Sequence, residues 1–244
     1  MAVRLSAAEA LYRTSDLPTN TNLTMCGWFR MIVDTNDFAT CFAVVAPSSS
    51  DADSVQTDGS GTTMGTYTNN DNWSLGPNWS LNTWYHVAMV CNSSSVDYYL
   101  NGVLESDGND GHSSVTSQSI VVGSYHHSTL VDEFNGEVAF VKVWDDILTQ
   151  AEIANEMWTI VPQKQENIHL WSPLFPGSTE RVKDYSGNGR NWTEGGTITD
   201  AVGPPIAWDL SGPVPLAPQL GSTWTLQYKR SVLPDSAYRN VPIG

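Results

Sequence analysis

The sequence predicts an all-β fold, a two-sheet antiparallel jelly-roll sandwich with one short helix and an extended C-terminal arm. Short runs of β-branched and aromatic residues recur along the 244 residues, separated by turns rich in Gly, Asn, Asp and Ser. Only 15% of the residues are charged, while 10 Trp, 9 Tyr and 6 Phe supply aromatic mass for a core. A single helical signal, after Thr149, interrupts the strand pattern.

The most informative stretch is residues 81–104, LNTWYHVAMVCNSSSVDYYLNGVL. Its first half, residues 84–91, is β-branched and aromatic without a helical charge pattern, so it predicts a strand buried on both faces. A polar Asn-Ser-Ser-Ser break leads into a second strand pattern at residues 96–100. Asn101-Gly102 then supplies the pair of residues with positive φ that a tight turn needs, and the whole stretch predicts a β-hairpin.

The remaining elements follow from the same signals. The predicted strands are residues 3–16 with their turn, 23–33, 38–46, the weaker 54–57 and 62–67, and then 119–123 and 136–144. The helix begins at Thr149, where Glu152 completes a capping box and where Ile153 and Met157 share one face. Residues 72–81 repeat Asn-Trp-Ser-Leu, which is too short for an architectural repeat.

Three segments together resemble a known family, the laminin-G-like, concanavalin A-like jelly rolls. The hairpin of residues 81–104 has that family's Trp, His-Val-Ala strand, polar break, Tyr-rich strand and Asn-Gly turn. Residues 23–29 resemble its early Thr-x-x-x-Trp strand, and residues 121–153 resemble its closing strands and short helix. The resemblance covers roughly residues 3–195 and implies the sandwich, but this fold hosts lectins, glycanases and interaction modules alike.

An Asp-x-Ser-Gly-Asn-Gly turn at residues 184–189 also resembles the family, where it lies near the start of the domain. Its late position here implies a circular permutation, which sandwiches tolerate because their ends lie close together. Gly187 and Gly189 suit left-handed turn positions, and Asp184 can accept backbone N–H bonds across the turn.

We expect a jelly-roll domain at residues 1–200 and a Pro-rich arm at residues 201–244. The arm holds seven of the 13 prolines, so it cannot be interior sheet. A Pro-rich terminus frays unless it is tied down, and we therefore expect it to dock on its own domain or on a neighbouring subunit. The predicted partner-binding residues are Trp224, Leu226, Tyr228, Lys229, Arg230, Leu233, Tyr238 and Arg239.

The net charge of −15 disfavours nucleic acid and anionic lipid as partners, because both require neutralisation by Lys and Arg. No window approaches the apolar length of a membrane span. The chain holds three cysteines, Cys26, Cys41 and Cys91. Their apolar strand contexts predict buried free thiols and folding in a reducing cytoplasm, with one disulfide and a spare thiol as the alternative.

No signal peptide is visible at the N-terminus, yet domains that resemble this one usually work outside cells. A bacteriophage virion protein would reconcile the two observations, because it folds in the host cytoplasm and leaves by lysis. We therefore expect a virion-surface location. The alternatives are an extracellular protein without its signal and an intracellular binding domain.

No catalytic residue is predicted. By resemblance, laminarinase-type enzymes of this fold carry Glu-x-Asp-x-x-Glu on one strand, and the nearest match here is residues 132–137. Glu133 and Glu137 share a strand face, but roughly 13 Å of strand separates them, too far for a retaining or an inverting pair. His86 is expected to be a packed core histidine. In a strand the side chains of His126 and His127 would diverge and make a poor chelate, and we expect them to be an exposed loop pair instead.

The resemblance also implies a possible Ca²⁺ at the sandwich edge, with Asp184 and Asn188 as candidate ligands, because oxygen donors suit this cation. The chain departs from the family at Ala139, where an Asp is usual. Carbohydrate binding would use aromatic side chains as stacking platforms. The candidates in turn-rich contexts are Trp73, Trp79, Tyr125 and Trp192.

The favoured function is a non-enzymatic binding module displayed on a bacteriophage virion, as a capsid decoration or a tail-associated adhesin. Its partners would be other virion subunits or copies of itself, held through the arm, and a cell-surface glycan. The alternative is a free carbohydrate-binding lectin, either calcium-dependent or not. A weaker alternative is a glycanase with a cryptic site.

Overall fold

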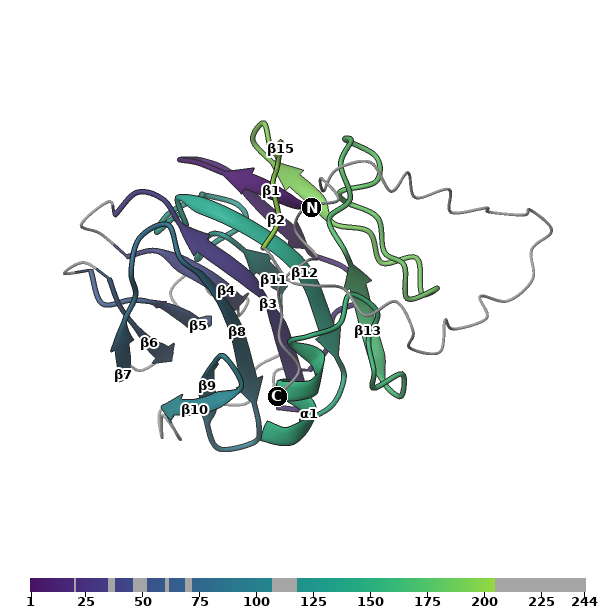
Figure 1. Cartoon of the computed structure of the whole chain (residues 1–244). Helices are drawn as coiled ribbons and strands as arrows, with labels where there is room; N and C mark the ends of the chain where they lie inside the picture. Colours follow the sequence, from purple (N-terminus) through teal and green to yellow (C-terminus); the bar gives the residue numbers. More distant parts are fainter. Residues whose placement is uncertain are drawn as a thin grey trace, which may run out of the picture. The chain divides into compact units, whose positions relative to one another are not determined.

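The computed structural model describes residues 1–19, 21–34, 38–45, 52–59, 62–68, 72–106 and 118–204. This part of the chain holds fifteen strands and one helix. The strands form two antiparallel sheets that lie face to face, which confirms the predicted sandwich (Figure 1). No helix in the described part is long and apolar enough to cross a membrane.

Each sheet mixes strands from distant parts of the sequence. The eight-stranded sheet runs β10 (Val103–Ser106), β9 (Val96–Leu100), β8 (Trp84–Cys91), β3 (Leu23–Met31), β12 (Gly136–Trp144), β1 (Ala2–Leu5) and β15 (Thr199–Ala201), with β13 (Ile168–Ser172) also paired to β12. The seven-stranded sheet runs β14 (Thr193–Gly195), β2 (Ala10–Arg13), β11 (Ser119–Val122), β4 (Thr40–Val45), β5 (Ala52–Thr57), β6 (Thr63–Thr68) and β7 (Asn72–Asn78).

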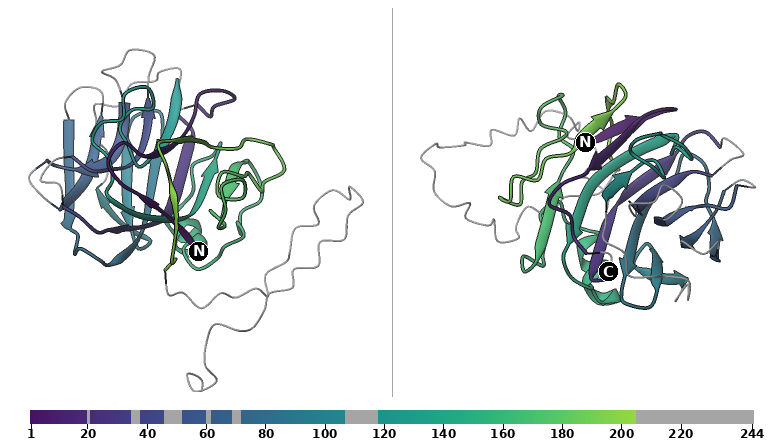
Figure 2. Two further views of the ribbon diagram at one scale, coloured as in Figure 1. Left: turned by 90° about the horizontal axis from the view of Figure 1, so that it is seen from above. Right: turned by 180° about the vertical axis from the view of Figure 1, so that it is seen from behind.

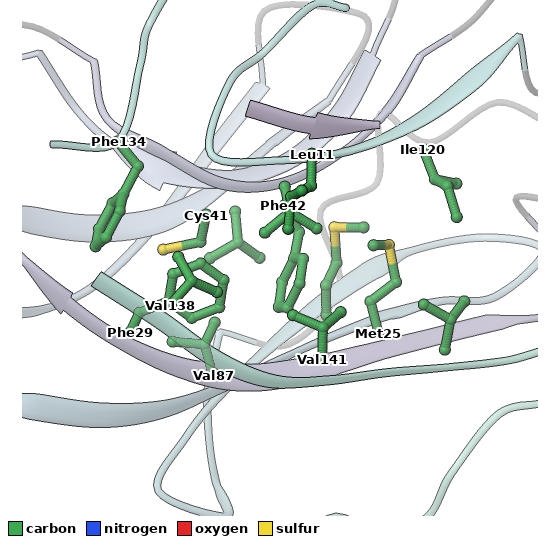
Figure 3. Close-up of a cluster of buried hydrophobic side chains, with 14 of the residues drawn as sticks. Leu11, Met25, Phe29, Cys41, Phe42, Val87, Ile120, Phe134, Val138 and Val141 are labelled. Atoms are coloured by element: carbon green, nitrogen blue, oxygen red, sulfur yellow. The ribbon is translucent and has the colours of Figure 1, made fainter. Parts of the chain in front are cut away.

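The main core fills the space between the sheets, where alternate side chains of each strand meet (Figure 3). Phe29 from β3 packs edge-to-face against Phe42 from β4 and against Phe134, with ring centroids 4.9 and 5.3 Å apart. All three rings are fully buried. Because residues that alternate with core positions point outward, the core fixes which side chains lie on the outer face of each sheet.

The predicted hairpin is confirmed as β8, β9 and β10. Asn101 and Gly102 join β9 to β10 with φ angles of 51° and 78°, as the turn chemistry requires. The Asn101 side chain also accepts a hydrogen bond from the backbone N–H of His86 at 3.0 Å. Gly102 lies against Ala154, so a Cβ at this position would come within 3.0 Å of the helix.

The predicted helix is α1 (Gln150–Glu156), and its capping box between Thr149 and Glu152 is confirmed. The helix covers part of the outer face of the eight-stranded sheet, where Ile153 joins a buried cluster with Tyr99 and Trp144. Figure 1 shows it at the end of the sandwich where β9 and β10 lie.

A buried ion pair ties the end of α1 to β12. The Lys142 ammonium donates to a Glu156 carboxylate oxygen at 2.7 Å and to the Thr159 carbonyl at 2.8 Å. The second oxygen of Glu156 accepts from the backbone N–H groups of Gln163 and Lys164 at 2.7 and 2.8 Å. Both charged side chains are only 1% exposed, so the pair is shielded from water.

Several elements differ from the sequence prediction, and β13, β14 and β15 lie where no strand was predicted. The predicted strand at residues 3–16 is divided into β1 and β2, which enter different sheets, because the chain turns at Ala8 with a φ of 62°. The stretch at residues 72–78, interpreted as a short repeat, is strand β7.

The late segment of the sandwich adds one strand beside each N-terminal strand. β15 pairs with β1 in one sheet, and β14 pairs with β2 in the other. Both views of Figure 2 place the green and yellow-green segment beside the purple N-terminal strands. This juxtaposition is the one that the predicted circular permutation requires.

The predicted domain boundary after residue 200 falls within β15. The division of the chain at this point stays a prediction. The predicted arm residues Trp224, Leu226, Tyr228, Lys229, Arg230, Leu233, Tyr238 and Arg239 lie outside the described residues.

Candidate functional site

The outer face of the seven-stranded sheet has a floor of small residues between two tyrosines. Tyr12 on β2 is in register with Val121 on β11, and Val121 with Ala43 on β4. Ala43 pairs in turn with Ser54 on β5, and Ser54 with Tyr67 on β6. Residues in register share a face, so Tyr12 and Tyr67 lie on the same side of the sheet with small side chains between them.

The loop after β11 folds back over this floor. Gly123, with a φ of 88°, begins the turn, and the Ser124 hydroxyl then donates to the Val131 carbonyl at 2.8 Å. The backbone N–H of Tyr125 donates to the same carbonyl at 3.0 Å. Tyr125 is thereby packed into a cluster whose other buried members are Ala10, Ala43, Val45, Ala52 and Val121.

The loop completes a continuous series of rings, which we call the ring row: Tyr67, Tyr125, His126, His127 and Tyr12. Successive ring centroids lie 6.0, 5.7, 6.4 and 5.5 Å apart. Tyr125 and His126 are buried, whereas Tyr12, Tyr67 and His127 are half-buried. The ring row therefore has the partly exposed ring of Tyr67 at one end, those of His127 and Tyr12 at the other, and two buried rings between them.

Two groups of the ring row, His127 and Tyr125, have shifted pKa values that keep them uncharged at neutral pH. Burial, together with the neighbouring His126, lowers the pKa of His127, so this imidazole is neutral at pH 7. Burial likewise raises the pKa of the Tyr125 phenol, which keeps it protonated. His127 Nδ1 lies 2.9 Å from the Ser119 hydroxyl oxygen, and this contact orients the ring. Imidazole and hydroxyl groups thus supply hydrogen bonding beside the ring faces.

The prediction that His126-His127 is a loop pair is confirmed, but the predicted exposure is wrong for His126. His126 is 6% exposed, and the two rings lie nearly parallel, with 29° between their planes. The physical reason is the turn held by Ser124, which folds the loop back over the sheet and removes the strand geometry in which the two side chains would diverge. Tyr12 and Tyr67 were not among the predicted site residues, because only the register of five strands brings them to one face.

The other predicted glycan-binding residues do not join Tyr125. Trp79 is 3% exposed, stacks on Tyr85 and donates its indole N–H to the Tyr98 hydroxyl at 2.9 Å. Trp192 is 4% exposed and belongs to the core between the sheets. Protein atoms therefore occupy the ring faces of both. The side chain of Trp73 lies outside the described residues, although its backbone pairs with Tyr67.

The candidate calcium ligands serve the turn that contains them. The Asp184 carboxylate accepts four hydrogen bonds of 2.8–3.1 Å, from the N–H groups of Trp171, Ser186 and Arg190 and from the Ser186 hydroxyl. The Asn188 amide donates to the carbonyl of Ile168 at 2.8 Å. No group of three or more His, Cys, Asp or Glu gathers within the described part of the chain. A calcium site stays a prediction.

The two predicted turn glycines are confirmed in left-handed conformations, with φ angles of 94° for Gly187 and 72° for Gly189. Together with the Asp184 hydrogen bonds, they account for this motif as a structural turn.

The carboxylates considered for catalysis have other partners. Glu137 forms a salt bridge with Arg30 at 2.5 Å, and Glu133 accepts a hydrogen bond from the backbone of Ala8 at 3.2 Å. His86 is buried as predicted, and burial lowers its pKa to about 3. The three cysteines are likewise buried, as predicted, and are free.

Comparisons with known proteins agree on the architecture. A family model described as the concanavalin A-like lectin/glucanases superfamily matches residues 6–154. A Bacteroides ovatus protein described as carbohydrate-binding is 18% identical, with a TM-score of 0.65 over 85% of this chain and 61% of its own. A heptameric SAP-like pentraxin from Limulus polyphemus is 15% identical, with a TM-score of 0.56 over 81% of this chain and 92% of its own.

A third solved structure is the CBM40 of the Ruminococcus gnavus IT-sialidase bound to α2,3-sialyllactose. It is 12% identical, with a TM-score of 0.51 over 63% of this chain and 95% of its own. Likeness at these identities establishes the fold alone. The chain spans less than two thirds of the Bacteroides ovatus protein, at 61% of its length. No curated protein matches the sequence closely enough to count as a relative.

Proposed function

Because the chain belongs to the concanavalin A-like lectin/glucanases superfamily, we propose that it is a carbohydrate-binding protein that acts without catalysis. The observation that carries this proposal is the ring row on the outer face of the seven-stranded sheet. Its half-buried rings, Tyr12, Tyr67 and His127, come from two strands and one loop and lie on a common face.

The chemistry of the ring row suits a neutral sugar. The C–H face of a pyranose packs on an aromatic ring, and nearby hydroxyl and imidazole groups supply the few polar contacts that fix its orientation. Half-exposed rings at both ends of the row favour a chain of sugar residues over a single one. The Bacteroides ovatus and Ruminococcus gnavus structures support carbohydrate in general as the class of ligand.

Display on a bacteriophage virion is a finer form of the same proposal. Carbohydrate binding does not depend on it, because the ring row lies within one copy of the domain.

The test is a glycan array with the full chain, followed by titration calorimetry with the best neutral ligand. Tyr12→Ala and Tyr67→Ala should each weaken binding by about twofold to tenfold, because an aromatic contact contributes about 0.5–1.5 kcal/mol. The matched control is Trp158→Ala, which removes an aromatic side chain that is 55% exposed beside the opposite sheet. Unchanged affinity in both tyrosine variants would exclude the ring row as the site.

The absence of catalysis has its own test. Laminarin, lichenan and agar should not be hydrolysed. Turnover that Glu137→Gln abolished would refute a purely binding function.

A further inference from the structure

A second set of aligned side chains lies on the outer face of the eight-stranded sheet, away from the ring row. Arg4 on β1 is in register with Glu137 on β12, Glu137 with Arg30 on β3, and Arg30 with Trp84 on β8. We call these four residues the charge row. Their chain neighbours Leu5, Val138 and Phe29 point into the core, so the charge row points outward.

The charge row holds two guanidinium groups and one carboxylate. Arg30 pairs with Glu137 at 2.5 Å, whereas among the described residues Arg4 donates only to the neutral amide oxygen of Asn135, at 2.6 Å. Six of the other described Lys and Arg residues form salt bridges: Arg30, Lys142, Lys164, Arg181, Lys183 and Arg190. Arg4 forms none within the described residues, although acidic residues outnumber basic ones by 26 to 11 in the chain.

Two N–H groups of the charge row also lack a hydrogen-bond partner in the described part of the chain. They belong to Arg4 Nη1 and Arg30 Nε, which are buried atoms on half-exposed side chains. Native proteins rarely leave such groups unpaired, and a bound ion or ligand often satisfies them. Both side chains are long, so a small rotation can present these groups to an anion. A carboxylate matches their forked geometry.

Aromatic surface borders the cationic groups. The Arg30 guanidinium carbon lies 5.4 Å from the ring centroid of the half-buried Trp84. In the next row of the sheet, Trp28 contacts Trp158, with 6.4 Å between ring centroids, and Trp158 is 55% exposed. A ligand that fits this surface carries a carboxylate on a ring with an apolar face.

We propose that the charge row is a binding site for acidic sugar residues, of which a uronic acid is the simplest. Arg4 and Arg30 hold the carboxylate, and the Trp84 ring packs against the sugar. Glu137 orients Arg30, and the charge row keeps one positive charge in excess. The site is separate from the ring row in both position and ligand charge, so either proposal can fail without the other.

The experiment compares glucuronate with glucose, two sugars that differ at one carboxylate, by NMR titration of the full chain with the Trp84 resonances as the reporter. Glucuronate should shift these resonances, less so at high ionic strength, and glucose should not. Arg4→Gln should weaken glucuronate binding about tenfold through loss of a charge-assisted contact. Arg4 has no ion-pair partner to orphan within the described residues, so this variant should fold, which thermal unfolding checks.

The matched control is Lys183→Gln, which removes one exposed positive charge elsewhere on the domain and should leave binding unchanged. Tyr12→Ala should also leave it unchanged. Arg4→Lys should recover part of the affinity, because it restores the charge without the fork. Equal responses to glucose and glucuronate, or wild-type binding by Arg4→Gln, would overturn the proposal.

Discussion

Replacing Lys142 with Met would break the buried ion pair that fastens the end of α1 to the eight-stranded sheet. The substitution removes an ammonium that donates to the Glu156 carboxylate, the Glu156 carbonyl and both oxygens of Thr159. The Glu156 carboxylate keeps two donors, the backbone N–H groups of Gln163 and Lys164. It is therefore left without its counter-charge but not without hydrogen bonds.

The reverse substitution, Glu156→Leu, is more damaging. It leaves the Lys142 ammonium, 1% exposed, with carbonyl and hydroxyl oxygens only, and it also orphans the backbone N–H groups of Gln163 and Lys164. Removing one partner of a buried pair costs about 3–5 kcal/mol of unfolding free energy. We expect Lys142→Met to cost about 3 kcal/mol of unfolding free energy. Glu156→Leu should cost about 5 kcal/mol or more, because each backbone N–H group that loses its acceptor costs about 1–3 kcal/mol in addition.

The double variant separates this reasoning from simple loss of contacts. In Lys142→Met/Glu156→Leu no unpaired charge remains, so it should be more stable than Glu156→Leu alone. Guanidinium denaturation of the four proteins, analysed by linear extrapolation, measures the differences. Two outcomes would contradict a stabilising ion pair between α1 and β12. In one, the losses of unfolding free energy in the two single variants add in the double variant; in the other, Lys142→Met costs less than about 1 kcal/mol.

Two further predictions concern buried titratable groups. Burial raises the pKa of the Cys26 thiol to about 12 and the pKa values of Cys41 and Cys91 well above their usual range. A thiol reagent should therefore label none of the three cysteines in the native protein and all three after unfolding. Fewer than three labelled thiols in the unfolded chain would reveal a disulfide. Burial lowers the pKa of His86 from 6.5 to about 3 in the folded state, so the unfolded state binds the proton first as the pH falls. Between about pH 6.5 and pH 3, the unfolding free energy should therefore decrease as the pH falls, and His86 contributes at most about 1.4 kcal/mol per pH unit to this decrease. In His86→Phe, which can keep the ring contact with Trp28, this contribution should vanish, and an unchanged pH slope would contradict the assignment.

Local signals in the sequence predicted the elements whose geometry is decided within a few residues. Asn101-Gly102 determines the turn from β9 to β10 because both residues accept positive φ, and Thr149 with Glu152 determines the start of α1 through reciprocal hydrogen bonds. The buried β8 strand was equally predictable, because a continuous β-branched and aromatic run has few other uses in a sandwich.

The ring row could not be predicted in this way. Tyr12 and Tyr67 share a face only because β2, β11, β4, β5 and β6 pair in one register, and register is a property of the sheet as a whole. His126 is buried because the Ser124 turn folds the loop back over the sheet. Trp79 lies in a turn-rich segment, yet its indole finds a buried partner in Tyr98, a contact that residue type alone does not indicate.

The charge row was invisible for the same reason. Arg4, Glu137 and Arg30 are separated by at least 26 positions in the sequence and become neighbours only when three strands align.

Because β14 and β15 pair with the N-terminal strands, the two sheets can be completed only after the late segment of the chain has been synthesised. Until residues 193–201 have been synthesised, β1 and β2 are open edges of their sheets, and the half of β12 that pairs with β13 is open until residues 168–172 have been synthesised. Open edges present unpaired N–H and C=O groups to other chains and invite aggregation. The nascent chain therefore exposes unpaired strand edges during most of its translation. We expect slow folding and dependence on a chaperone holdase in cells.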